Sequence, residues 1–173
     1  MRLASLLASL FVAGDALAQA APAVPPCNAP EYRQFDFWVG RWDARWTDAQ
    51  GKTAQGSNRI EKTLDGCVIV EHFDGAPGSP LKGTSVSTYD RGAGQWKQTW
   101  VDNTGAYLDF SGTWKDGRMT LARKAVVQGK PALQRMVFRD IGATRFTWDW
   151  EVSSDEGASW TTQWRIEYTR TTP

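Results

Sequence analysis

Apolar and polar residues alternate along most of the chain, as they do in strands that are buried on one side only. From Gly40 to Trp46 every second residue is apolar or glycine, and the residues between them are charged. The same alternation returns over residues 145–151 and 160–168. Each segment therefore predicts a β-strand with one apolar face and one polar face.

Nine turn signals, most of them an Asp or Asn with a Gly one to three residues later, divide the chain into ten such runs. They lie at residues 48–51, 65–66, 74–75, 90–92, 103–105, 116–117, 128–129, 140–142 and 155–157. Ten strands joined by hairpins would leave exposed edges in an open sheet. The chain is therefore predicted to be all-β, an up-and-down antiparallel barrel of about ten strands, with a two-sheet sandwich as the alternative. One short N-terminal helix is expected from Asn28 through about Phe35, because Pro30 and Glu31 stand at capping positions.

The N-terminus reads as a targeting segment followed by one domain. Residues 1–20 have a short positive start, an apolar middle and an Ala-x-Ala ending at Ala20, which together predict a secretory signal peptide. Cleavage is expected after Ala20, with Ala18 as the second choice. A Pro-rich lead-in covers residues 21–30, and residues 31–173 form a single domain. We expect a periplasmic or secreted protein, and no later stretch is long and apolar enough for a transmembrane helix.

The two cysteines, Cys27 and Cys67, are the only pair available. Export places them in an oxidising compartment, so a disulfide between them is predicted, with two separate thiols as the alternative. One His and two distant Cys form no ligand cluster, so neither a metal nor another cofactor is expected.

The balance of charges and the tryptophan content reduce the number of functional classes to consider. Lys and Arg number 20 against 19 Asp and Glu, which excludes a strongly electrostatic nucleic-acid binder. Ten Trp are many for one small domain, and they either fill a barrel completely or line a cavity in it. Nothing in the sequence indicates the oligomeric state.

The run Phe35-Asp-Phe-Trp-Val-Gly-Arg-Trp-Asp43 resembles the opening signature (FDFWxGxW) of an uncharacterised bacterial family with a lipocalin-like (calycin) β-barrel. The resemblance continues over residues 58–67, 98–103 and 168–170. It implies a lipocalin-like fold and brings no agreed activity with it.

Gly40-Arg41-Trp42 is similar to the G-x-W motif of lipocalins, in which the Trp closes one end of the barrel and an Arg of the last strand packs across it. The resemblance assigns that second role to Arg170 or Arg165, as a cation over an aromatic face. Haem-binding barrels of the same broad class use a His late in the chain, whereas the only His here is His72, so haem is not expected.

Residues Ser153 to Trp160 resemble one Asp-box, S-x-D-x-G-x-x-W, the motif on hairpin turns of sialidase propellers. A propeller would need several copies, so this single copy indicates a hairpin.

Glu71 is the strongest candidate for chemistry, because it shares a strand face with Ile69 and Phe73. Apolar neighbours would raise its pKa and suit it to acid–base work. The favoured alternative is a structural ion pair with Arg59 or Arg135. The adjacent His72 is expected to be a packed or rim side chain.

Two strand faces mix aromatic and polar groups: Trp96, Gln98, Trp100 and Asp102 on one, and Tyr107, Asp109 and Ser111 on the other. Faces of this kind line ligand cavities when they point inward. We therefore predict a barrel that binds a small, largely apolar or aromatic molecule through Glu71, Trp100, Asp102, Asp109 and Tyr107. The alternatives are a small-molecule enzyme that uses Glu71 with Asp102 or Asp109 as acid and base, and a structural envelope protein.

Overall fold

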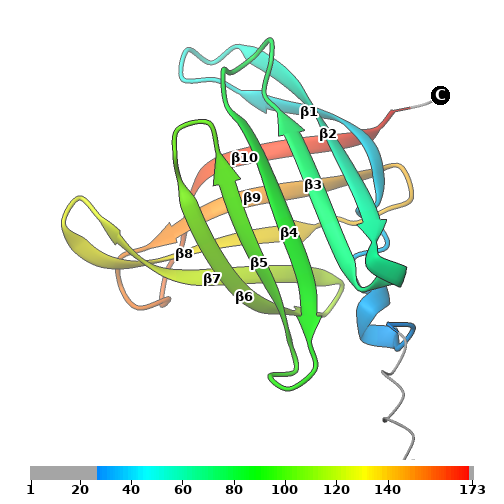
Figure 1. Cartoon of the computed structure of the whole chain (residues 1–173). Helices are drawn as coiled ribbons and strands as arrows, with labels where there is room; N and C mark the ends of the chain where they lie inside the picture. Colours follow the sequence, from blue (N-terminus) through cyan, green and yellow to red (C-terminus); the bar gives the residue numbers. More distant parts are fainter. Residues whose placement is uncertain (1–26, 172–173) are drawn as a thin grey trace, which may run out of the picture.

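The computed structural model describes residues 27–171, and the predicted signal peptide lies outside these residues. Ten strands make up the fold (Figure 1). They are β1 (Gly40–Thr47), β2 (Thr53–Thr63), β3 (Val68–Asp74), β4 (Lys82–Asp90), β5 (Gln95–Asp102), β6 (Tyr107–Lys115), β7 (Arg118–Val127), β8 (Lys130–Arg139), β9 (Arg145–Ser153) and β10 (Thr161–Arg170).

Every strand pairs antiparallel with its neighbours in the sequence, and β1 pairs with β10, so the sheet closes into a barrel. All nine predicted turns fall at connections between consecutive strands. The predicted ten-stranded up-and-down barrel is confirmed, and the sandwich alternative is excluded. Closure pairs every strand on both sides and removes the exposed edges that an open sheet would leave.

The predicted N-terminal helix is wrong in kind. In its place stands a single 3₁₀ segment, η1 (Pro30–Arg33), whose N-cap is Ala29 and not Asn28. Hydrogen bonds between residues three apart, as in a 3₁₀ helix, continue beyond it. One of them runs from the Trp38 amide to the Phe35 carbonyl. Tyr32, Phe35 and Trp38 are all buried, so the apolar spacing is three residues, the period of a 3₁₀ helix. A second 3₁₀ segment, η2 (Leu64–Gly66), joins β2 to β3.

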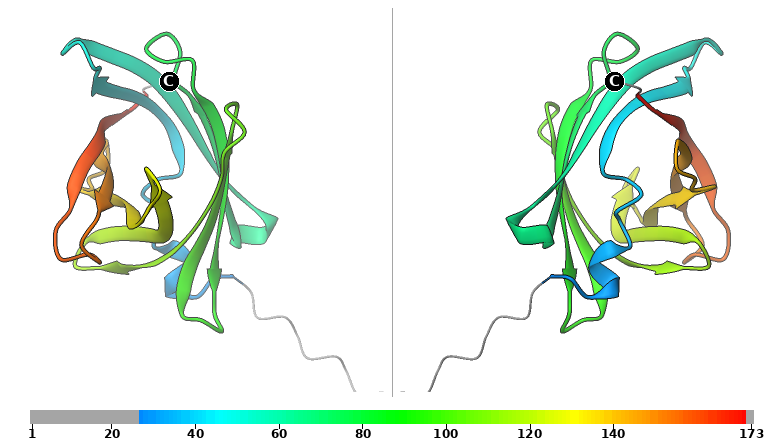
Figure 2. Two further views of the ribbon diagram at one scale, coloured as in Figure 1. Left: turned by 90° about the vertical axis from the view of Figure 1, so that its left-hand side faces the viewer. Right: turned by 90° about the vertical axis from the view of Figure 1, so that its right-hand side faces the viewer.

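The segment that precedes β1 plugs one end of the barrel, the lower end in Figure 2. Phe35 is fully buried there, with its ring centroid 4.8 Å from that of Trp96 and 5.5 Å from that of Phe138. Trp42 packs edge-on against Phe146 at 4.8 Å. Aromatic side chains therefore pack tightly at this end of the barrel.

The C-terminal arginine predicted to cover Trp42 is Arg170. Its guanidinium carbon lies 4.2 Å from the centre of the Trp42 ring, and its nitrogens donate to the carbonyls of Val39 (2.9 Å) and Phe37 (3.1 Å). Gly40 has a φ of +136°, a conformation that L side chains rarely adopt, and a Cβ there would also collide with this guanidinium; both features favour glycine. Arg165 instead pairs with Asp149.

Two local predictions concern covalent and turn structure. Cys27 and Cys67 form a disulfide, which ties the segment before η1 to the start of β3.

In the 153–160 hairpin, Ser159 and Ser153 donate hydrogen bonds to Asp155 and lower the pKa of its carboxyl to about 2. The Asp-box therefore acts here as a turn structure.

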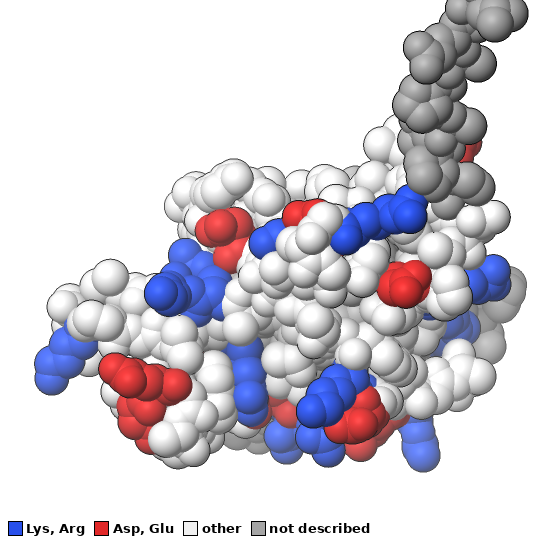
Figure 3. Space-filling view, turned by 90° about the horizontal axis from the view of Figure 1, so that it is seen from below, with Lys and Arg blue, Asp and Glu red and all other residues white. Residues whose placement is uncertain are grey.

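On the face shown in Figure 3, basic and acidic side chains are interspersed. Neither 3₁₀ segment of residues 27–171 has the length and apolar character of a membrane-spanning helix.

Candidate functional site

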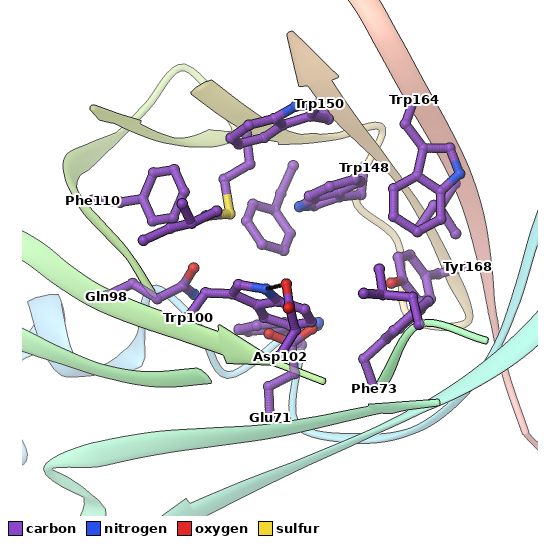
Figure 4. Close-up of a pocket in the computed structure, with 16 residues that line it drawn as sticks. Glu71, Phe73, Gln98, Trp100, Asp102, Phe110, Trp148, Trp150, Trp164 and Tyr168 are labelled. Atoms are coloured by element: carbon purple, nitrogen blue, oxygen red, sulfur yellow. Dashed lines mark hydrogen bonds between the residues drawn. The ribbon is translucent and has the colours of Figure 1, made fainter. Parts of the chain in front are cut away.

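A cavity of about 230 Å³ lies inside the barrel, toward the end opposite the plug (Figure 4). Its floor includes Trp38 and Phe138, which are buried. Its wall includes the half-buried residues Trp100 on β5, Trp148 on β9 and Trp164 on β10. Aromatic rings of β3, β5, β6, β9 and β10 make up most of the wall.

Small residues occupy the inner face of β4, beside the cavity wall. Gly83, Ser85 and Ser87 alternate on its inner face, next to the much larger inward side chains of β5. The indole of Trp100 lies so close to Gly83 that a Cβ there would collide with it. The two expectations for the tryptophans are therefore each met in part: Trp42 belongs to a filled end, and Trp100 to the wall of a cavity.

Glu71 lies on the inner face of β3 and is 8% exposed. Its Oε1 accepts a hydrogen bond from Asn58 Nδ2 at 2.7 Å, and its Oε2 accepts one from Ser85 Oγ at 2.6 Å. Burial raises the pKa of this carboxyl, although both hydrogen bonds act in the opposite direction. Glu71 is thus a buried acid held by neutral donors.

The expected ion pair of Glu71 with Arg59 or Arg135 is wrong. Arg59 pairs with Glu61, and Arg135 pairs with Glu151 at 2.6 Å. The reason is the two-residue period of a strand: Asn58 and Ile60 are buried inside the barrel, so Arg59 between them points outward. The same rule places His72 on the outside of the barrel. Its side chain is 44% exposed, and its Nε2 lies 3.9 Å from Glu61 Oε2.

The polar cluster around Glu71 includes residues that the sequence did not reveal. Asn58 Nδ2 also lies 3.3 Å from the Tyr168 hydroxyl, and burial together with the nearby Glu71 raises the pKa of Tyr168. Among the residues that the structure describes, buried Asn58 Oδ1 and Trp38 Nε1 have no hydrogen-bond partner. The one available sequence signal was an Asn at an inward position of β2, between Gly56 and Ile60 on the same face.

Asp102 lines the cavity but its oxygens are already engaged. Oδ2 accepts from Trp100 Nε1 at 2.9 Å, and Oδ1 accepts from the Thr104 amide at 2.9 Å and from the Thr104 hydroxyl at 2.6 Å. Burial acts to raise its pKa, but these hydrogen bonds outweigh burial and lower it. Asp102 therefore orients the Trp100 ring and holds the turn after β5.

Tyr107 and Asp109 do not share this cavity, which corrects the expectation that their face points inward. Trp100 is paired directly with Leu108 across the sheet, and directly paired residues point to the same side. Leu108 therefore lines the cavity, while Tyr107 is 67% exposed on the outside and Asp109 is exposed beside it. Of the five predicted ligand residues, the structure brings together Glu71, Trp100 and Asp102.

The fold and site define a closed ten-stranded antiparallel β-barrel with an aromatic internal cavity. The model of the family described as "Protein of unknown function (DUF1579)" matches residues 29–170, and the chain belongs to this family. A search of curated proteins finds no match. Among solved structures, a redesigned β-barrel aligns at 13% identity and a TM-score of 0.43, over 81% of this chain and 96% of that one.

Proposed function

We propose that this protein is an exported, lipocalin-like barrel that binds a small, largely apolar molecule in its cavity. The observation behind the proposal is the aromatic cavity of about 230 Å³ with Glu71 as a polar group in its wall. A concave apolar wall with a few directed polar groups is the usual form of a small-molecule site. The contact between Trp42 and Arg170 is of the kind that closes lipocalin barrels, and supports that part of the proposal.

Export is supported by the leader-like residues 1–20 and by the disulfide between Cys27 and Cys67. N-terminal sequencing of the protein from its native host should return a start near Ala21. A chain that still begins with Met1 would contradict the export part of the proposal, and leave the cavity argument as it is.

Binding is tested by calorimetric titration with propylbenzene and with a panel of fatty acids, aromatic compounds and retinoid-like compounds. At least one should bind saturably, with one site per chain. Leu108→Trp should abolish that binding, because the larger ring would occupy the cavity that Leu108 lines. Val86→Trp is the matched control, since Val86 is 49% exposed on the outer face of β4. No saturable binding by any compound, or equal binding to both variants, would refute the cavity as the site.

A further inference from the structure

The cavity is acidic in its balance of groups. Among the described residues that line it, those able to carry charge are Glu71, Asp102 and Tyr168, and none is Lys, Arg or His. The basic residues on the strands that flank β3 are paired elsewhere: Arg59 with Glu61, Lys62 with Asp36, and Lys82 with Asp74. An anionic ligand would meet like charge here, whereas a cationic ligand would find a carboxyl group without a counter-ion.

The aromatic wall favours the same charge. The ring centroids of Trp148 and Trp164 lie 5.8 Å apart, those of Phe73 and Trp164 lie 5.9 Å apart, and those of Phe73 and Trp100 lie 6.4 Å apart. These rings form one connected wall that spans both sides of the cavity in Figure 4. Aromatic faces carry negative electrostatic potential and attract ammonium groups, most strongly where water is excluded.

Resting on the proposed function, we infer that the ligand is a small organic cation: an apolar body among the aromatic rings, with an ammonium group against the Glu71 carboxylate. The ammonium group supplies the counter-ion that the Glu71 carboxylate does not have within the described residues. Asp102, which also lines the cavity, adds a second negative charge without giving up the hydrogen bonds that hold Trp100.

Two probes of nearly the same shape test this inference: phenethylammonium and its neutral counterpart propylbenzene. Glu71→Gln keeps the size of the side chain and removes its charge; its amide oxygen can still accept from Asn58 Nδ2, and its NH2 group can donate to the Ser85 hydroxyl. It should weaken phenethylammonium binding by at least about tenfold and change propylbenzene binding by less than about twofold. Hydration of the free ammonium is the same in both titrations and cancels in the comparison. Glu61→Gln, which alters an exposed carboxylate on the neighbouring strand, should change neither affinity.

The pH dependence of the wild-type protein gives a second measurement that needs no variant. An alkylammonium stays charged between about pH 5 and about pH 8. Its binding should strengthen with rising pH as Glu71 ionises, and this rise should occur at a higher pH than the usual titration of a Glu side chain, because burial raises the pKa of that carboxyl. The other groups that face the cavity do not interfere: the pKa of Asp102 is lowered and that of Tyr168 is raised. Propylbenzene binding should not follow this profile.

The outcomes separate the two proposals. If propylbenzene binds and Glu71→Gln affects both probes alike, the cation inference is refuted and the proposed apolar binding function stands. If phenethylammonium binding depends on pH in the wild type and in Glu61→Gln but not in Glu71→Gln, Glu71 is supported as the group that binds the ammonium. If neither probe binds and the wider panel also fails, the proposed function itself is refuted.

Discussion

Trp42 offers the sharpest test of how the barrel is closed. Its side chain is fully buried, its Nε1 donates to the Trp38 carbonyl at 2.7 Å, and one ring face is covered by Arg170. Trp42→Ala removes the ring from a packed end where the surrounding rings have little freedom to collapse into the space.

Truncation of a fully buried Trp destabilises a protein by about 3–5 kcal/mol. The lost hydrogen bond and the lost cation–aromatic contact place Trp42 toward the upper part of that range. In a domain of this size each kcal/mol corresponds to about 2–4 °C of melting temperature. We therefore expect Trp42→Ala to melt about 10 °C or more below the wild type.

Urea and thermal unfolding, followed by circular dichroism, measure this loss. Trp160→Ala is the matched control, because Trp160 is half-buried on a hairpin and packs against Arg135, so its removal should destabilise by less than about 2 kcal/mol. Arg170→Lys keeps the charge but loses the fork of donors to backbone carbonyls, and should fall between the two. If Trp42→Ala melts within a degree or two of the wild type, or no lower than Trp160→Ala, the reasoning about the closed end is wrong.

Three further predictions concern stability and site geometry. The denatured, non-reduced protein should contain no alkylatable thiol, and reduction of Cys27–Cys67 should lower stability by about 4 kcal/mol in the loop-entropy model; two reactive thiols before reduction would contradict this. Because the pKa of Glu71 is raised in the folded state, stability from its neutral form is present below its usual pKa and is lost as pH rises through the raised value. Glu71→Gln should therefore gain stability relative to wild type as pH increases in urea titrations, and a constant difference from about pH 4 to about pH 7 would count against a buried acid. Gly83→Ala should displace the Trp100 indole, seen as a changed near-ultraviolet circular dichroism spectrum with the far-ultraviolet spectrum retained.

The sequence was enough for features that depend on near neighbours. Turn residues such as Asp116-Gly117 and the alternation from Gly40 to Trp46 are local signals, and they predicted the strands and the barrel. The disulfide was predictable because two cysteines allow one pairing. The prediction of the N-terminal helix was wrong because it rested on capping residues alone. Packing against the end of the barrel buries Tyr32, Phe35 and Trp38, and their three-residue spacing favours a 3₁₀ conformation.

The tertiary structure decided which face of an ambiguous strand points inward. Along β6 both faces contain an aromatic residue, Tyr107 on one and Phe110 on the other, so alternation alone leaves two solutions. Pairing of Leu108 with Trp100 selects one of them, and the whole face follows because a strand repeats every two residues.

Glu71 shows the same limit at the level of chemistry. Its partners Asn58 and Ser85 are 13 and 14 residues away in the chain, and Tyr168 reaches the same cluster from the last strand. The sequence by itself determined that an acid would lie on a partly apolar strand. Only closure of the barrel decided that this acid would face neutral donors and aromatic rings, because strand register, and not residue type, determines which side chains meet across a sheet.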